Sequence, residues 1–466
     1  MCRMEAFMKL FKSLLLIFFI TVLNLNAENY TIKWGKTIEI GSGDAAEGIT
    51  YDTTGYIYVT GYANFNTSNN ILTLKYDSLG NLLKIDTLNI GVDYAYDITS
   101  DNDGNYFIAG YTKTGSNYDF LLAKYNPYDS LLWSRTFDNG ENDYAFAVAT
   151  DKHNNVYIAG HSTFGSQNLA IIIEYDTDGN ILWSDTLFYS YGSNENTNDI
   201  AIDTADNIYL TGKTTYTTEA IWTLKYDSLK NIVWQDTIDK GYNGRGIGIT
   251  LGNNNVYMVS YVYNGSNNDI LTAKYDTAGN IIWENIIDNG DEDYASSIVT
   301  DRFGYIYIGG YSMINGDYDF LIVKYNYAGN IIWADTFDYG GNDYLHDIDV
   351  DTYGNIYVAG NNSSNGFITI MYENQQGIVS NDRTIDNNDV KIKQTGKGKI
   401  NISFTPAPQN DYSISIYNLT GSLIKKIRTT EINNGNITVN NLTPGIYMLR
   451  YKVSSFERKN KFVILP

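Results

Sequence analysis

The chain has little of several residue types that catalytic and metal sites require. Its 466 residues include one cysteine, Cys2, five prolines and three histidines. Cys2 precedes an expected cleavage point, so the mature chain should hold no thiol, which excludes a disulfide scaffold, a cysteine nucleophile and a CxxC metal site. His153, His161 and His346 lack metal-ligand spacing, and no HExxH, GxSxG or Walker motif is present.

Basic residues are also scarce over most of the chain. Residues 34–381 hold 15 basic and 45 acidic residues, a charge of −30, whereas residues 383–466 hold 13 basic and 5 acidic residues, a charge of +8. An acidic body repels phosphate backbones, so we expect no nucleic-acid partner. No later segment approaches 18 consecutive apolar residues, so we expect no integral membrane span.

The first residues have the pattern of a secretory signal peptide. Lys9 and Lys12 precede an apolar run from Leu14 to Leu23, and Ala27 provides a small residue at a cleavage point. No cysteine follows the apolar run, which excludes a lipoprotein anchor. We therefore expect export with removal of residues 1–27; an uncleaved anchor is the alternative.

Three short motifs recur about every fifty residues. The first has the form Ile-Tyr-Val-x-Gly, the second is Lys-Tyr, and the third is a tryptophan. Self-similarity at this period is typical of repeat architectures. The first motif begins at Ile57, Tyr106, Val156, Ile208, Val256, Ile306 and Ile356. The tryptophans stand at 34, 133, 183, 234, 283 and 333, with Lys84 in the remaining register.

Each repeat reads as four short strands separated by Asp-, Asn- and Gly-rich turns. Seven such units predict an all-β fold, a seven-bladed β-propeller over residues 28–380. The tryptophan-type strand at Trp34–Ile40 comes before the first complete unit, and the seventh unit ends before its own. We therefore expect the N-terminal strand to complete the last blade and close the ring.

The repeat also resembles a known family. Units of the form Asp-Tyr-Ala-x-x-Val-x-x-Asp, Gly-Asn-Ile-Tyr-Val-Ala-Gly and Lys-Tyr-Asp-x-x-Gly-Asn-Ile-x-Trp are similar to the bacterial SBBP-type β-propeller repeat over about residues 34–378. The segment Asp176 to Trp183 resembles the tryptophan docking motif of quinoprotein propellers. The vicinal cysteines typical of many such dehydrogenases are missing, so we interpret this second likeness as shared blade packing.

The basic tail is a separate module. Residues 381–389 read as a linker, and residues 390–466 alternate as expected for a small Ig-like β-sandwich. Its strings Ile416–Gly421, Leu442–Tyr451 and Lys461–Ile464 resemble the type A C-terminal sorting domain of type IX secretion. The resemblance implies that residues 390–466 engage the type IX translocon and that the protein is secreted or stays on the outer surface of a Gram-negative bacterium. A plain adhesive Ig-like module is the alternative.

Acidic residues stand thirteen positions before six of the seven Ile-Tyr motifs, at the start of the innermost strand, and we expect them to ring one mouth of the central channel. The register is Asp44, Asp93, Asp143, Glu195, Asn243, Asp293 and Asp343, often followed by tyrosine, at Tyr94, Tyr144, Tyr294 and Tyr344. Asp119, Asp269 and Asp319 should face the same side. Clustered carboxylates attract Ca²⁺, and Asp beside Tyr suits hydroxyl-rich ligands. A second regular set of aspartates, which includes Asp52, Asp101 and Asp151, lies at the opposite strand ends. Its presence favours a structural role for both sets, in which each aspartate bonds the backbone of its own turn.

Arg245 breaks the repeat, because it occupies the register of Ala95, Ala145 and Ala295. It is either a counter-charge to the acids or an anchor for an acidic ligand group. We expect no catalytic residue and no obligatory cofactor, with Ca²⁺ the one ion that the acids would suit. The first hypothesis is a non-catalytic module that binds an extracellular protein or glycan. A glycan-active or quinoprotein-like enzyme and an adhesive or surface-layer component are the alternatives.

Overall fold

The computed structural model describes residues 18–19, 29–65, 68–187, 194–215, 218–241, 243–363, 366–375, 390–396, 399–404, 412–418, 423–427, 436–441, 445–453 and 456–464. Apart from Phe18 and Phe19, the predicted signal peptide lies outside these residues, as does the predicted linker 381–389. The chain divides into two compact units, one formed by Ile32–Glu373 and the other by the strands that follow Asn374.

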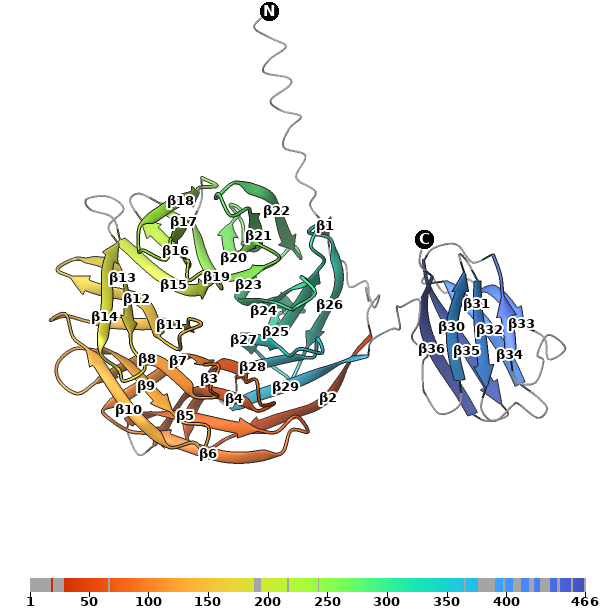
Figure 1. The fold of residues 1–466 in the computed structure, drawn as a ribbon, viewed down its shortest axis with the longest axis horizontal. Coiled ribbons are helices and arrows are strands. Elements are labelled where there is room, and N and C mark those ends of the chain that lie inside the picture. Colours follow the sequence, from red (N-terminus) through yellow and green to blue (C-terminus); the bar gives the residue numbers. More distant parts are fainter. Residues whose placement is uncertain are drawn as a thin grey trace, which may run out of the picture. The chain divides into compact units, whose positions relative to one another are not determined.

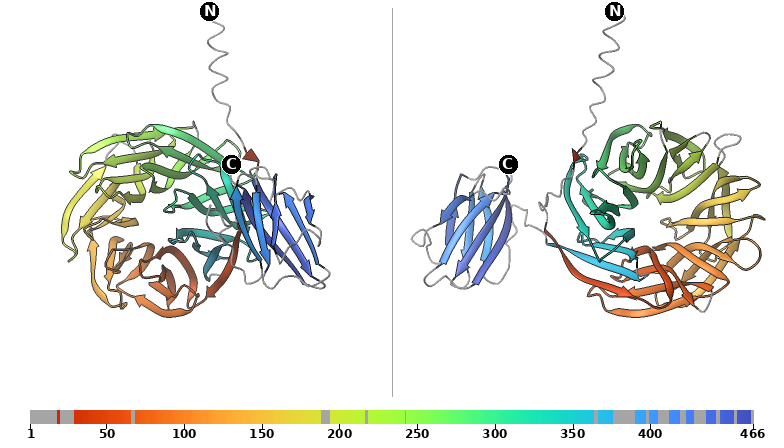
Figure 2. Two further views of the ribbon diagram at one scale, coloured as in Figure 1. Left: turned by 45° about the vertical axis from the view of Figure 1, so that its right-hand side comes forward. Right: turned by 180° about the vertical axis from the view of Figure 1, so that it is seen from behind.

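The first unit is a ring of seven antiparallel sheets (Figures 1 and 2). The strands of the first four blades, from the inside outward, are β3 (Ser42–Tyr51), β4 (Ile57–Phe65), β5 (Ser68–Tyr76), β6 (Leu82–Leu88); β7 (Val92–Ser100), β8 (Tyr106–Lys113), β9 (Asp119–Tyr125), β10 (Leu131–Phe137); β11 (Asp143–Thr150), β12 (Val156–Phe164), β13 (Gln167–Tyr175), β14 (Ile181–Leu187); and β15 (Asn194–Ile202), β16 (Ile208–Thr215), β17 (Glu219–Tyr226), β18 (Ile232–Ile238). Those of the last three are β19 (Gly244–Gly252), β20 (Asn255–Tyr263), β21 (Asn268–Tyr275), β22 (Ile281–Asp288); β23 (Asp293–Thr300), β24 (Ile306–Ile314), β25 (Asp317–Tyr325), β26 (Ile331–Phe337); and β27 (Asp343–Val350), β28 (Ile356–Asn362), β29 (Phe367–Gln375), β2 (Asn29–Ile38).

The N-terminal strand closes the ring. The seventh sheet has the order β2-β29-β28-β27, so β2 is the outer strand of a blade whose other three strands come more than 300 residues later. This confirms the predicted closure. The two-residue strand β1 (Phe18–Phe19) pairs parallel to the outer strand β22 of the fifth blade.

Burial within each blade follows the residue types of its strands. In the third blade, β12 and β13 are buried along most of their length, whereas the outer strand β14 alternates between exposed and partly buried positions. Blades that pack on both sides require strands without a polar face, which explains the continuous apolar motifs. The turn acids act locally: Asp101 Oδ1 accepts hydrogen bonds from the amides of Asp103 and Asn105, at 2.9 Å each.

The tryptophan and Lys-Tyr motifs join neighbouring blades. Trp133 Nε1 and Lys124 Nζ both donate to the carbonyl oxygen of Thr177, in the turn before the outer strand of the next blade, at 3.1 Å each. Trp234 and Lys225 reach Thr277 in the same way. The buried lysine stem also lies against an aromatic ring, with Lys124 Nζ 5.1 Å from the centroid of Phe107. The repeated lysines are therefore structural.

Aspartates connect the innermost strands of adjacent blades, which share no sheet hydrogen bonds. Asp199 Oδ2 accepts from the amide of Ile249, and Asp349 Oδ2 accepts from the amide of Tyr51, at 2.7 Å each. The second contact joins blade seven to blade one. Burial raises the pKa of Asp199 and of Asp349 to about 7 in each case, although the backbone donors oppose the shift.

These two carboxyls make stability depend on pH in a defined direction. The folded protein holds their protons more tightly than the unfolded chain, in which the pKa is near 3.8. We therefore expect the unfolding free energy to fall as pH rises from about 4 to about 7. Melting temperatures measured at pH 5 and pH 8 in about 1 M NaCl, which screens exposed charges, should show the higher value at pH 5. Asp199→Asn should reduce the difference; equal melting temperatures for the wild type would contradict the prediction.

The second unit consists of two small sheets, which confirms the β-rich tail. One has the order β30-β31-β34 and the other β33-β32-β35-β36. Their strands are β30 (Val390–Gly396), β31 (Lys399–Phe404), β32 (Tyr412–Asn418), β33 (Leu423–Ile427), β34 (Asn436–Val439), β35 (Gly445–Val453) and β36 (Phe456–Ile464). In the described part of the chain, no helix has the length and apolar character that crossing a membrane requires.

Candidate functional site

The predicted acidic ring lies at the start of the innermost strands, beneath the surface. Asp93, Asp143, Asp293 and Asp343 each have 0% exposed area. Each accepts a hydrogen bond from the connection that arrives from the preceding blade; Asp143 Oδ2, for example, accepts from the amide of Asn139 at 2.8 Å. These acids therefore fix the segment that connects each blade to the next. A ligand at the surface would contact the residues beside the acids before it reached the acids.

Those neighbours are tyrosines, which gather into two equivalent clusters. We call them quartet A (Tyr94, Tyr111, Tyr118, Tyr144) and quartet B (Tyr294, Tyr311, Tyr318, Tyr344). In each quartet every tyrosine is partly exposed. The members of quartet B follow those of quartet A by 200 residues, or four blades. The predicted site tyrosines Tyr94 and Tyr144 thus share one cluster, and Tyr294 and Tyr344 share the other.

The geometry of the two quartets is nearly the same. The ring centroids of Tyr111 and Tyr144 are 4.8 Å apart at 89°, and those of Tyr311 and Tyr344 are 5.1 Å apart at 88°. The fourth ring, Tyr118 in quartet A and Tyr318 in quartet B, lies 5.6 Å from its Tyr144 or Tyr344 neighbour. Edge-to-face packing of this kind fixes the rings while it leaves parts of their faces exposed.

Strand register explains how the quartets form. Tyr94 is the direct cross-strand partner of Tyr111. Because successive side chains of a strand point to opposite faces, Asp93 is buried while its neighbour Tyr94 stays partly exposed. Tyr118 comes just before β9, and Tyr144 belongs to β11 of the next blade. Quartet A therefore bridges blades two and three, and quartet B bridges blades six and seven.

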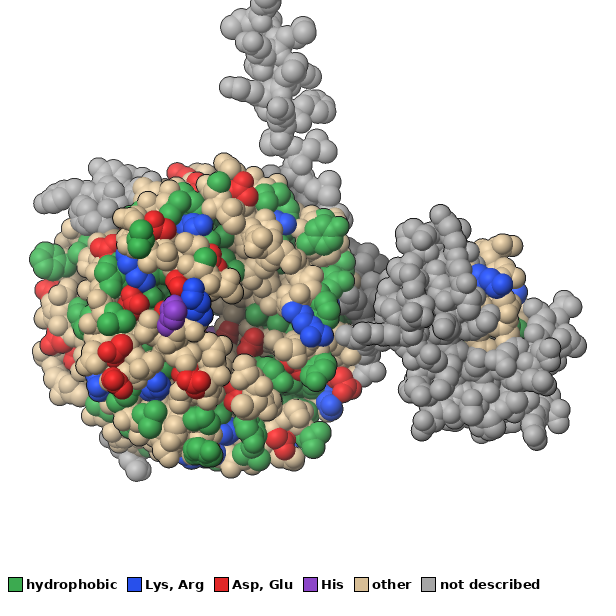
Figure 3. Space-filling model, in the orientation of Figure 1, with side chains coloured by type: hydrophobic (Ala, Val, Ile, Leu, Met, Phe, Trp, Pro, Cys, Tyr) green, Lys and Arg blue, Asp and Glu red, His purple; other side chains and the backbone are tan. Residues whose placement is uncertain are grey.

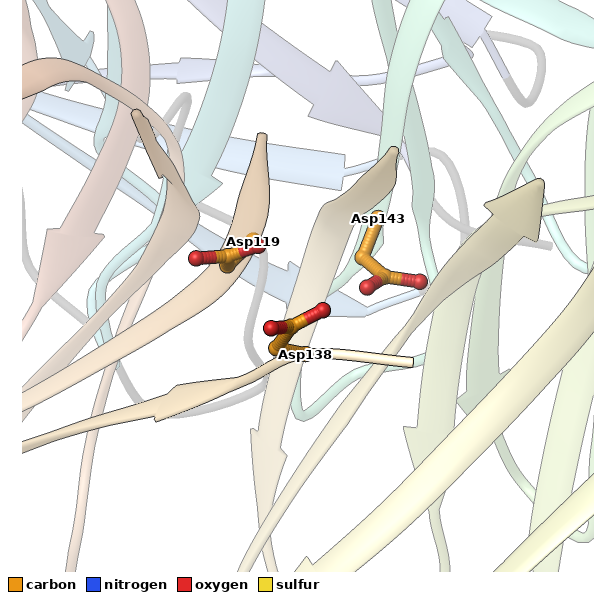
Figure 4. Close-up of side chains that lie close together, drawn as sticks. All are labelled: Asp119, Asp138 and Asp143. Atoms are coloured by element: carbon orange, nitrogen blue, oxygen red, sulfur yellow. The ribbon is translucent and has the colours of Figure 1, made fainter. Parts of the chain in front are cut away.

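Among the described residues, a trio of aspartates lies at each of three blade junctions. Each trio combines the first residues of a third strand, the residue at the end of an outer strand and the ring acid of the next blade. Figure 4 shows the carboxylates of Asp119, Asp138 and Asp143 turned toward one another. The equivalents are Asp269, Asp288, Asp293 and Asp319, Asp338, Asp343; in each trio, one oxygen of each carboxylate lies within 4.8 Å of the others.

Burial and mutual repulsion act on these carboxyls. Burial, followed by the charges of Asp338, Asp317 and Asp343, raises the pKa of Asp319 to about 6. Burial also raises the pKa of Asp269 and of Asp293 to about 6 each, with smaller contributions from neighbouring acids. Three like charges at this separation destabilise one another unless a cation or protons are bound.

Arg245 lies beside a different group of residues. Its Nη2 donates to Asn198 Oδ1 of the fourth blade at 2.9 Å. Burial, then the charges of Arg245 and Lys213, lower the pKa of His161 to about 4. Arg245 is therefore hydrogen-bonded to blade four, and its charge acts on His161 of blade three; neither residue is a ring acid. Figure 3 shows one face of the ring, hollowed at its centre, with acidic side chains inside and basic side chains and a histidine at the edge.

Several members of these clusters do not follow from the alignment of single blades. Asp138, Asp288 and Asp338 complete the trios, and Tyr111, Tyr118, Tyr311 and Tyr318 complete the quartets. A signal for them exists in the sequence, because each trio keeps separations of 19 and 5 residues and the quartets repeat at 200 residues. Comparison of blade junctions, rather than of blades, would have found both.

Comparisons with known proteins address mainly the tail. Residues 396–465 match the family described as the secretion system C-terminal sorting domain. No curated protein matches the chain. Among solved structures, the chain is similar to a protein of unknown function from Dyadobacter fermentans DSM 18053, with 10% identity over 74% of this chain and 99% of that chain and a TM-score of 0.44.

The fold and the tail together define the class of protein. It is a seven-bladed β-propeller that carries a type IX secretion C-terminal sorting domain. That domain directs the protein to the secretion machinery and so to the outer surface or the surroundings of a Gram-negative bacterium.

Proposed function

We propose that this protein is a non-catalytic binding module of the cell exterior, and that quartets A and B bind an extracellular glycan. The observation that carries the proposal is the duplication of a partly exposed tyrosine cluster with nearly identical ring geometry. Tyrosine rings offer an apolar face for a sugar ring and a hydroxyl for its polar edge. A structural role alone would not require partly exposed aromatic rings at the same two junctions.

Two equivalent sites on one rigid ring would favour a repetitive ligand. A polysaccharide presents the same unit many times, so a single chain that reaches both quartets gains avidity without any new contact. Quartet A lies beside the trio of Asp143, and quartet B lies beside that of Asp343; in each trio the second member, Asp138 or Asp338, is exposed and could accept from sugar hydroxyls. The even repetition of these acids supports binding rather than catalysis, which would use one asymmetric pair.

Two finer assignments complete the proposal. We propose that the blades are SBBP-type repeats, which their Asp-Tyr-Ala, Ile-Tyr-Val-x-Gly and Lys-Tyr motifs support. We also propose that residues 390–466 are a type A sorting domain that contacts the type IX translocon directly and is removed after export. The first rests on the repeat motifs, and the second rests on the quoted strings of the tail and on its +8 charge.

Substitution of one tyrosine in each quartet tests the glycan site. Tyr118→Ala with Tyr318→Ala should weaken binding to the best ligand of a soluble glycan panel at least about tenfold, because each ring supplies an exposed face at the centre of a cluster. Affinity is measured by isothermal titration calorimetry on the folded variant. Tyr128→Ala with Tyr327→Ala is the matched control, because these tyrosines are 86% and 67% exposed and lie outside the quartets.

Two results would contradict the proposal. Unchanged affinity in the quartet variant, or an equal loss in the control, would remove the quartets as the site. Release of sugar fragments during long incubation with the wild type would contradict the non-catalytic assignment and favour the glycan-active enzyme instead.

A further inference from the structure

The three aspartate trios have one construction at three different blade junctions. The first member opens the third strand of a blade, the second follows nineteen residues later and the third five residues after that. A glycine with positive φ stands two residues after the second member, at Gly140, Gly290 and Gly340. Its amide donates to Oδ1 of that second aspartate at 2.7 Å and so orients its carboxylate. The trios are therefore built in the same way each time.

Buried carboxylate oxygens in the trios lack hydrogen-bond partners among the described residues. Asp319 and Asp343 are 6% and 0% exposed, and Oδ1 of each has none. Asp269, 3% exposed, and Asp143, 0% exposed, likewise each have an unpartnered Oδ1. A buried ionised oxygen without a donor or cation costs several kcal/mol, roughly, so these atoms require a positive partner.

The junction between blades one and two provides a comparison within the same chain. There Asn70 and Asn89 occupy the registers of the other two trio members, because Ile71 pairs with Leu88 as Phe120 pairs with Phe137 in the second blade. Both oxygens of Asp93 accept hydrogen bonds, from the amides of Ile90 and Gly91 and from the hydroxyl of Thr112. At this junction the protein itself therefore satisfies the ring carboxylate, whereas Asp44 Oδ1, at the junction of blades seven and one, has no hydrogen-bond partner among the described residues.

We propose that each trio binds one Ca²⁺, so that the propeller holds three calcium ions at the junctions of blades two and three, five and six, and six and seven. Ca²⁺ takes oxygen ligands at about 2.3–2.6 Å, so two ligands on opposite sides of the ion lie about 5 Å apart, and the 4.8 Å limit within each trio fits that span. Mg²⁺ demands shorter bonds and near-octahedral geometry, and Zn²⁺ favours nitrogen and sulfur ligands. The ion would join two blades through carboxylates from both. The inference does not rest on the glycan proposal, although two of the three trios lie beside the quartets.

Calcium titration of the full chain tests the sites directly. Isothermal titration calorimetry after removal of metal should give about three Ca²⁺ per chain, with dissociation constants of about 10⁻⁴–10⁻³ M, as in extracellular modules. Asp338→Asn should remove one ion, and the triple variant Asp138→Asn, Asp288→Asn, Asp338→Asn should remove all three. The asparagine Oδ1 can still accept from the glycine amide, so the turn is kept.

Melting temperatures distinguish Ca²⁺ binding at a trio from nonspecific attraction of Ca²⁺ to an acidic protein. In EDTA, Asp338→Asn should melt at a higher temperature than the wild type because one like charge is gone; in 5 mM Ca²⁺, a concentration above about 10⁻³ M, it should melt at a lower temperature. Asp178→Asn, an exposed turn acid outside the trios, is the matched control and should change neither. Calcium binding by the triple variant equal to that of the wild type, no binding by the wild type, or binding of Mg²⁺ in preference to Ca²⁺ would overturn the proposal.

Discussion

A chain that begins at Ser42 should lose the single cooperative melting transition that a chain beginning at Glu28 shows. The missing segment contains β2, which supplies the outer strand of the seventh blade. Without it, β29 presents a free edge and the blade can no longer bury its third strand. The closing contacts join distant parts of the sequence, so their loss affects the whole ring and not only its last blade.

Trp34 makes several of the contacts that close the ring. It is 8% exposed, and its ring centroid lies 5.8 Å from that of Tyr76 in blade one and 6.4 Å from that of Tyr357 in blade seven. Its Nε1 donates to the carbonyl oxygen of Ser78 at 3.3 Å. Truncation of a buried tryptophan costs about 3–5 kcal/mol, so Trp34→Ala should lower the unfolding free energy by that amount.

Circular dichroism in urea and on heating measures both variants. Lys36→Ala is the control, because Lys36 lies exposed in the same strand and its truncation should change stability by less than about 0.5 kcal/mol. Melting of the shortened chain with an unchanged midpoint and slope would show that the ring does not depend on its N-terminal strand.

Gly160→Ala should destabilise the propeller by about 3 kcal/mol or more. A Cβ atom at this position would lie 1.9 Å from the carbonyl oxygen of Tyr144 and 2.9 Å from Cα of Ala145. The inner strand has a β-bulge between Ala145 and Ala147, which explains why its backbone comes so close. The clash is with backbone atoms of a buried strand, so relief requires movement of the strand.

The same contact explains why glycine ends most of the Ile-Tyr motifs. At Gly61, Gly110, Gly212, Gly310 and Gly360 a Cβ would also meet a carbonyl oxygen at 1.9–2.1 Å. The fifth blade has Ser260 instead and pairs it with Gly246, in an inner strand where Gly244 and Gly248 add backbone freedom. Gly115→Ala is the control, because its Cβ would meet no atom within 4 Å. Equal urea midpoints for the two variants would contradict the steric explanation.

Prediction from the sequence succeeded where each residue acts within its own repeat. The seven motifs predicted seven four-stranded blades, because the same strand pattern recurs in every repeat. The position of Trp34, before the first complete repeat, predicted that the N-terminal strand closes the ring. The turn aspartates likewise perform their local task at every recurrence, as Asp101 does. The hydrogen bonds of Trp133 and Lys124 could not be predicted from one repeat, because both residues donate to a carbonyl oxygen of the following blade.

The sequence alone determined the fold class, the ring closure and the export tail, because strand alternation, repeat phase and sorting motifs are local properties of the chain. Only the tertiary structure decided which residues meet between blades. It buried the ring acids, placed the tyrosines in two quartets and brought Asp138, Asp288 and Asp338 to their trios. The physical reason is that a junction combines a third strand and an outer strand of one blade with the first strand of the next, and ring curvature sets their separation.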